Sequence, residues 1–142
     1  MVLIDFIRNK NIDGNVYLLK DSNMKKGEIC RITGIKSIPT VTRKLDYIKN
    51  NNIEIELENI PQWVYDNLNV PYLVKVWLLY CNGIDDVRAI IKMMGIGDTQ
   101  NNLDNVTCCL ECIRKHTEVK KISSGRMEKE DVLKKLKDVW GK

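Results

Sequence analysis

Cysteine and histidine gather in one short stretch of the chain, CCLECIRKH. Cys108, Cys112 and His116 follow one another at intervals of four residues, which places their side chains on one side of a helix. Cys109 adds a CxxC spacing with Cys112. Thiolate and imidazole are ligands that zinc prefers, but one continuous helix cannot arrange four of them as a tetrahedron around an ion. These four residues are therefore weak metal candidates, and the alternatives are thiols packed in a helical core or a redox-sensitive cluster.

Catalytic chemistry has few candidate residues in this sequence. His116 is the only histidine, and no partner for imidazole-based catalysis is apparent. The chain lacks a phosphate-binding glycine loop, a dinucleotide fingerprint, a nucleophile elbow and a paired-carboxylate acid/base site. We therefore expect no enzymatic activity, no catalytic residue and no cofactor.

A second kind of chemistry is available to the cationic and hydroxyl side chains between residues 36 and 44. Amines and guanidinium groups neutralise phosphates, and arginine also pairs with the edge of guanine. Hydroxyl groups bond phosphate oxygens together with backbone N–H groups at a helix N-terminus. The stretch is therefore a candidate DNA-binding site. Its candidate residues are Lys36, Ser37, Thr40, Thr42, Arg43 and Lys44.

Further along the chain, amide and hydroxyl side chains form a second candidate set. Glutamine and asparagine pair bidentately with adenine, but Asp98 and Asp104 lie in the same stretch and would repel phosphate. This stretch either touches DNA or belongs to a unit that serves dimerisation or packing. The candidate residues are Thr99, Gln100, Asn101 and Asn102, with Arg88 on the preceding expected helix.

The two candidate sets lie at corresponding places of an internal repeat. The run VYLL at residues 16–19 matches VWLL at residues 76–79, at an offset of 60. Each unit is predicted to contain a helix, a short turn, a second helix, a glycine-containing turn and a third helix. The later positions match at an offset of 61, and they are Ile29, Ile32, Gly34 and Ile35 against Ile90, Met93, Gly95 and Ile96.

The first copy, GEICRITGIKSIPTVTRKL, resembles the helix-turn-helix of DNA-binding regulators, in which E-I-A-x-x-x-G-I precedes S-x-x-T-V-x-R-x-L. The matching residues are Glu28, Ile29, Gly34, Ile35, Thr40, Val41, Arg43 and Leu45. Cys30 replaces the usual alanine, and the four residues between Ile35 and Thr40 are one more than is usual. The second copy, GIDDVRAIIKMMGIGDTQNNLDNV, resembles the motif through Val87, Ile90, Gly95 and Ile96. The resemblance implies that the third helix of the first unit enters the major groove, at an angle that the preceding helix fixes.

Hydrophobic periodicity predicts an all-α fold. Val41, Leu45 and Ile48 are spaced as one face of a helix, for example. Over residues 53–57, apolar residues alternate with glutamates instead, which indicates a short β strand or an extended linker.

The expected organisation is two tandem units of three helices and a C-terminal helix. Aspartates 85 or 86 are expected to cap the helix that ends at Gly95. After it, one helix starts near residues 98–99, a longer one covers about residues 106–119, and KKISSGR forms a polar hinge. The predicted boundaries are 1–52 for the first unit, 53–70 for a connecting segment, 71–122 for the second unit and 123–142 for the C-terminal helix.

Composition limits the partners and the compartment. The chain has 142 residues, of which 44% are hydrophobic, and a formal net charge of +4, which permits an acidic partner such as nucleic acid. No apolar run approaches the roughly 20 residues that cross a bilayer, and the start lacks a signal-peptide pattern. Five cysteines, an odd number, do not suit a secreted disulfide framework. We therefore expect a cytoplasmic protein with no membrane partner.

The C-terminal stretch MEKEDVLKKLKDVW carries an apolar stripe at helical spacing. Such a stripe must be covered, either by the chain's own core or by a second copy of the chain. Because most helix-turn-helix regulators pair to bind two half-sites, this helix is the candidate dimer element, and a homodimer is expected. The stripe consists of Val132, Leu133, Leu136, Val139 and Trp140.

These observations lead to a sequence-specific protein that binds double-stranded DNA. The leading hypothesis is a small transcriptional regulator, such as a repressor, that places a helix in the major groove. One alternative is a plasmid or phage accessory factor that marks an origin or a centromere. Another is a protein-interaction module that reuses the three-helix fold, which the acidic second unit and the modest net charge favour.

Overall fold

The computed structural model describes residues 2–55, 57 and 59–124, and side-chain surroundings up to residue 117. Within these residues the chain forms eight helices and no strand, so the predicted all-α class is confirmed. The helices are α1 (Leu3–Arg8), α2 (Gly14–Leu19), α3 (Lys26–Thr33), α4 (Ile38–Asn50), α5 (Gln62–Asp66), α6 (Leu73–Cys81), α7 (Val87–Met94) and α8 (Gln100–Ser124). None of the helices in this part of the chain combines the length and the apolar character that a bilayer crossing requires.

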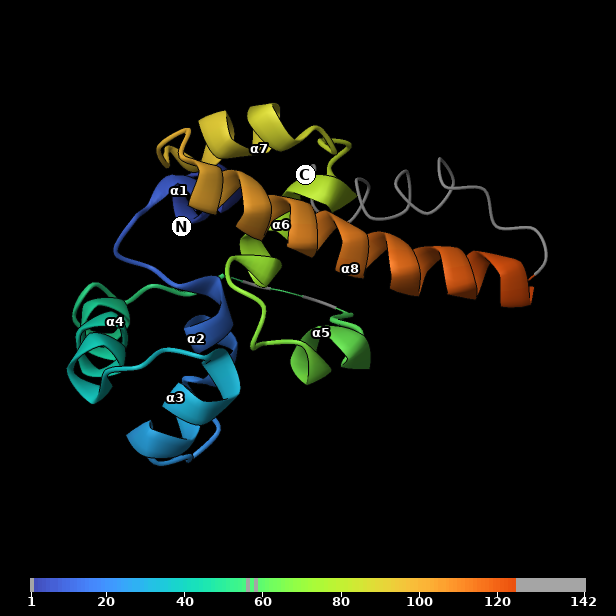
Figure 1. Ribbon diagram of the computed structural model, residues 1–142. Coiled ribbons are helices and arrows are strands. Elements are labelled where there is room, and N and C mark those ends of the chain that lie inside the picture. Colours follow the sequence, from blue (N-terminus) through green and yellow to red (C-terminus); the bar gives the residue numbers. More distant parts are fainter. Residues whose placement is uncertain (1, 56, 58, 125–142) are drawn as a thin grey trace.

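Six of the helices form two groups of three that follow the sequence repeat. Helices α2, α3 and α4 contact one another in the first group, and α6, α7 and α8 contact one another in the second. Figure 1 shows the first group at the lower left and the second group above it, with α8 running across the molecule. Gly34 ends α3 with φ 74°, and Gly95 ends α7 with φ 69°. Both glycines therefore adopt the left-handed conformation that closes a helix without a Cβ clash.

Helices α2 and α6, the first of each group, contact one another at their N-terminal ends. A Cβ atom on Gly14 would lie 3.0 Å from the Cβ of Val74 and 3.4 Å from the Cγ of Lys75, so a larger residue would require α6 to shift by a few tenths of an ångström. The Asn15 side chain is buried there, and its Oδ1 accepts a hydrogen bond from the Val74 N–H at 3.1 Å. The repeat offset of 60 residues makes Gly14 equivalent to Val74 and Asn15 equivalent to Lys75. The contact between residues 14 and 75 is therefore equivalent to the contact between residues 74 and 15. The contact therefore has the pattern of an isologous interface, in which two like elements meet around a pseudo-two-fold axis.

Asn15 also ties the first group to the loop that precedes α6. Its amide Nδ2 donates to the carbonyl oxygens of Leu68 at 2.8 Å and Val70 at 2.7 Å. The side chain thus satisfies two backbone acceptors and one donor inside the protein, which removes the desolvation penalty that those groups would otherwise carry.

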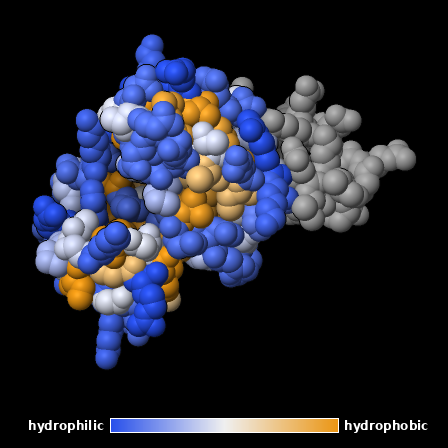
Figure 2. All heavy atoms as spheres, in the orientation of Figure 1, coloured by the Kyte–Doolittle hydropathy of each residue, from blue (hydrophilic) through white to orange (hydrophobic). Residues whose placement is uncertain are grey.

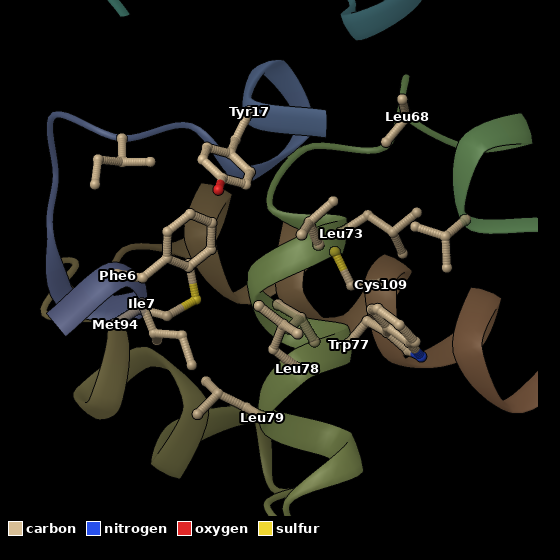
Figure 3. Packing of buried hydrophobic residues seen from close by; sticks show 14 of the residues in the cluster. Phe6, Ile7, Tyr17, Leu68, Leu73, Trp77, Leu78, Leu79, Met94 and Cys109 are labelled. Carbon is tan, nitrogen blue, oxygen red and sulfur yellow. The ribbon is translucent and has the colours of Figure 1, made fainter. Parts of the chain in front are cut away.

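One hydrophobic cluster runs through both groups of helices. Figure 3 shows its centre, where Phe6 of α1 lies between Tyr17 of α2 and Met94 of α7. The Phe6 and Tyr17 rings meet edge to face, with centroids 5.3 Å apart. Because α1 contacts α7 and α2 contacts α6, the core is shared between the two halves of the chain.

The expected strand near residues 53–57 does not form in the residues that the structure describes there, 53–55 and 57. Ile53 is buried in the core, and Ile55 and Leu57 are half-buried against it, which accounts for the alternating pattern. In place of a partner strand, the Tyr17 hydroxyl accepts a hydrogen bond from the Ile55 N–H at 2.6 Å and donates to its carbonyl at 3.3 Å. The alternation marks an extended segment that lies on the core.

The two helices expected after residue 98 form a single helix, α8, which includes the first residues of the expected hinge. Residues 98–124 contain no glycine or proline that would interrupt it. Thr99 begins the helix, since its Oγ1 accepts a hydrogen bond from the Asn102 N–H at 3.2 Å. The rest of the predicted hinge and the apolar stripe from Val132 to Trp140 lie outside the described residues.

Candidate nucleic-acid interface

Helix α4 has one face in the core and one in solvent. Val41 and Ile48 are buried and Leu45 is half-buried, and this face packs against α2 and α3. The spacing of these residues at i, i+4 and i+7 forms the stripe that fixes the helix. Among the described residues, the opposite face of α4 is exposed to solvent at Arg43, Asp46 and Asn50.

The N-terminal half of the exposed face carries three chemically different side chains. Ile38 is 52% exposed although it is apolar, and Arg43 is exposed one helical turn further along. Thr42 lies between them, and its hydroxyl donates to the Ile38 carbonyl at 3.0 Å. Arg43 forms no ion pair with any carboxylate of the described residues, and its Nη2 makes only a long contact of 3.5 Å with the Thr40 hydroxyl. Ile38 and Thr42 share one side of the helix, and Arg43 lies on the side opposite the buried Val41.

The start of α4 leaves its first backbone N–H groups without a side-chain partner. Ser37 is the N-cap residue, but its side chain makes no capping hydrogen bond, whereas Asp13 caps α2 and Asp86 caps α7. The predicted capping role of Asp86 is thereby confirmed. Lys36 is exposed in the turn before α4. This end of the helix presents N–H groups, a hydroxyl and an ammonium, which together suit a phosphate oxygen.

Four of the predicted residues of this stretch are half-buried, namely Ser37, Thr40, Thr42 and Lys44. The Lys44 Nζ donates to the Lys10 carbonyl at 2.9 Å. The Lys44 amine is therefore directed across α4 towards the loop before α2. Asp46 is exposed one turn after Thr42 and would repel phosphate, which confines an anionic partner to the N-terminal half of the helix.

The corresponding surface of the second group is occupied by contacts within the chain. Arg88 forms an exposed ion pair with Asp98, with Nη1 and Oδ2 3.0 Å apart. The Gln100 amide donates to Asp104 at 2.8 Å, and the Asn102 amide donates to the Gly97 carbonyl at 2.7 Å. Asn101 is exposed on the same turn of α8. Two of the three amides predicted to contact DNA, Gln100 and Asn102, thus bond within the chain at the start of α8, although exposed pairs of this kind are weak enough to exchange.

The cysteine and histidine stretch does not form a convergent site. Cys109 is buried, and its Sγ donates to the Pro71 carbonyl at 2.9 Å, while Cys108 is exposed and Cys112 is half-buried. Burial raises the pKa of the Cys109 thiol. The His116 ring stacks on Trp63 with centroids 4.8 Å apart. The part of the chain that the structure describes contains no group of three or more His, Cys, Asp or Glu side chains that could hold a metal ion.

Ile38 is the residue of this surface that the sequence patterns did not single out. Ile38 lies three residues before Val41, so helical spacing places it on the same side as the buried stripe and predicts burial. Its exposure at the first turn of α4 is a finding of the structure that the sequence does not signal.

The chain was compared with protein-family models, with curated proteins and with solved structures, and no match was found in any of the three.

Proposed function

We propose that this protein binds double-stranded DNA in a sequence-specific way and acts as a small transcriptional regulator in the cytoplasm. The observation that carries the proposal is the N-terminal half of α4, where Ile38 and Arg43 are exposed on a helix whose other side is held by the core. The major groove is wide enough to admit one helix.

The side chains of α4 match the chemistry of base edges and phosphates. Arg43 suits the two acceptors of guanine or a phosphate, and Ile38 suits the thymine methyl group by apolar contact. Ser37 and Lys36, with the N–H groups of the first turn, suit a backbone phosphate and would set the position of the helix. Base recognition and backbone positioning would then come from one end of one helix.

The second group of helices would take a supporting role in this proposal. Arg88 is engaged by Asp98, and Asp104 adds negative charge to the same surface, so phosphate binding there is weak. This observation also favours the second candidate function, a protein-interaction module in which α8 meets a partner. A homodimer through the sequence stripe at residues 132–140 remains part of the DNA-binding proposal, and a plasmid or phage accessory role would show as arrays of sites instead of single sites.

The experiment that tests the proposal starts with selection of bound duplexes from a random pool, followed by affinity measurement by fluorescence anisotropy. We expect Arg43→Ala to weaken specific binding by about 1–3 kcal/mol, because a bidentate base contact is lost. Arg114→Ala, at an exposed arginine of α8, is the matched control and should leave the affinity unchanged. A loss of affinity in Asn101→Ala equal to that in Arg43→Ala would show that α8 also contacts bases.

Salt dependence separates DNA binding from the protein-interaction alternative. Affinity for a random duplex should fall steeply as salt rises, because each neutralised phosphate releases counterions. The absence of duplex binding at low salt would exclude both the regulator and the accessory factor. Equal affinities of the Arg43→Ala variant and the unchanged protein for the selected duplex would exclude the docking of α4.

A further inference from the structure

A cavity of about 350 Å³ lies between the two groups of helices, beside the crossing of α2 and α6. In Figure 2 the left part of the molecule is hollowed between its upper and lower halves, with hydrophilic residues around an apolar interior. Lys10, Ile12 and Lys44 line the cavity from the first half of the chain, and Lys75 and Met94 line it from the second. Its size falls in the range of small-molecule sites.

Lys75 is a buried cation in this cavity. The residue is only 6% exposed, and its Nζ donates to the Asn9 carbonyl at 2.7 Å. No carboxylate of the described residues forms an ion pair with it. Asp13 also lines the cavity, but its Oδ1 accepts hydrogen bonds from the N–H groups of Asn15 at 2.8 Å and Val16 at 3.1 Å and thereby caps α2. An ammonium that is buried without a paired anion is unfavourable, and an anion entering the cavity would remove that penalty.

The rest of the lining adds positive charge at one side and apolar surface at the other. Three lysines, Lys10, Lys44 and Lys75, line the cavity. The Lys44 amine donates a hydrogen bond to the Lys10 carbonyl at 2.9 Å. Tyr72 contributes a half-buried phenol from a backbone with φ 65°, a left-handed conformation that is strained for an aromatic residue. Strained residues of this kind cluster at ligand sites. Met94 also lines the cavity and supplies apolar surface.

We propose that this cavity binds a small organic anion, with its carboxylate or phosphate group against Lys75 and its apolar part between Ile12 and Met94. The burial of Lys75 favours a small molecule over a phosphate of a DNA backbone, which remains on the surface of its duplex. The site needs no DNA to form, and it is tested on the protein alone. Because its walls come from both halves of the chain, an occupant would contact both groups of helices at once.

The test is a calorimetric titration of the full chain with three probes that separate charge from apolar contact. Phenyl phosphate carries both features, inorganic phosphate carries only the charge, and benzyl alcohol carries only the ring. We expect saturable one-to-one binding of phenyl phosphate, weaker binding of inorganic phosphate and none of benzyl alcohol. Lys75→Met should weaken phenyl phosphate binding by about tenfold or more, because a charge-assisted hydrogen bond is lost. Lys10→Met, at the exposed rim, should weaken it to a smaller extent and serves as the second variant.

Lys49→Met is the matched control, since Lys49 is an exposed lysine of α4 that does not line this cavity. Its affinity for phenyl phosphate should equal that of the unchanged protein. The proposal is overturned if neither anion binds saturably, if Lys75→Met binds as well as the unchanged protein, or if Lys49→Met weakens binding as much as Lys75→Met does. A loss of duplex affinity in Lys75→Met as large as its loss of phenyl phosphate affinity would assign the site to a DNA phosphate and overturn the small-molecule proposal.

Discussion

Two polar residues, Asn15 and Lys75, are buried where the two halves of the chain meet. Asn15 and Lys75 occupy equivalent places of the repeat, yet they have opposite consequences. Asn15 satisfies three backbone groups, whereas the Lys75 amine donates to a carbonyl and forms no ion pair with a carboxylate of the described residues. One residue therefore stabilises the junction of the two halves, and the other destabilises it as long as it is charged.

The stability of the protein should depend on pH through Lys75. Burial lowers the pKa of Lys75 from 10.5 to about 8; Asp13 counteracts this and Lys44 adds to it. The unfolded chain thus binds more protons than the folded chain between these values, and the free energy of unfolding rises with pH there. Between pH 8 and 9 Lys75 should add about 1 kcal/mol to the free energy of unfolding. The buried thiols Cys81 and Cys109 oppose this rise, so it is measured as the difference between the unchanged protein and Lys75→Met. Urea denaturation at pH 7, 8 and 9 measures it.

Lys75→Met is the control for this pH dependence and should lack the rise. Above pH 9 the free energy of unfolding should fall as pH rises. Burial raises the pKa of Cys81 to about 12 and also raises that of Cys109. The folded chain therefore keeps protons that the thiols of the unfolded chain release. A rise of equal size in the Lys75→Met variant would show that another group titrates.

At the scale of helices, the sequence predicted what depends on neighbouring residues. The turn at Gly34, the turn at Gly95 and the buried stripe of α4 follow from local spacing and were confirmed. The polar run KKISSGR was interpreted as a hinge, but α8 continues to Ser124, since polarity alone does not distinguish a solvated helix from a break. The alternating residues 53–55 and 57 resembled a strand because the partner of the Ile55 N–H, the Tyr17 hydroxyl, lies far away in sequence.

The cavity was missed for the same reason. Lys10, Lys44 and Lys75 lie more than thirty residues apart from one another, and each alone looks like a solvated lysine. The available signal was the position of Lys75 within the apolar run YLVKVWLLYC, where a surface lysine is not expected. For the proposed DNA-binding surface, the sequence indicated α4 and Arg43, but the direction of the Lys44 amine required the fold.

Two glycines on helices allow a matched test of backbone conformation. Gly95→Ala should destabilise the protein by about 1 kcal/mol, because its φ of 69° is strained for a residue with a Cβ, although the space around it is open. Gly27→Ala, inside α3 with nothing within 4 Å of the added Cβ, should stabilise by about 0.5–1 kcal/mol. Urea midpoints of the two variants decide this. Shifts in the same direction would contradict the role of the left-handed turn.

At the scale of the whole molecule, the two groups of helices share one core and should unfold together. Asn15 joins α2 to α6 and to the loop before it, so its loss affects both halves. We expect Asn15→Ala to lower the free energy of unfolding by about 3 kcal/mol, because buried backbone groups lose their partner. Asn51→Ala, which removes an exposed bond to the Tyr47 carbonyl, is the control and should change it by under about 0.5 kcal/mol.

Hydrogen exchange in the Asn15→Ala variant provides the second measurement. Protection of the slowest amides of α4 and of α6 should fall by the same amount, as expected for one cooperative unit. Loss of protection in α4 alone would show that the first group opens by itself.

The close approach of Gly14 and Val74 requires residues of different size at equivalent positions of the two repeats. If a first repeat were joined to a copy of itself, glycine would face glycine and leave a hole on the axis that relates them. If a second repeat were joined to a copy of itself, two valines would compete for the space that one now fills. The two halves are therefore complementary at the contact between α2 and α6. A chimaera built from two identical halves would lose this contact.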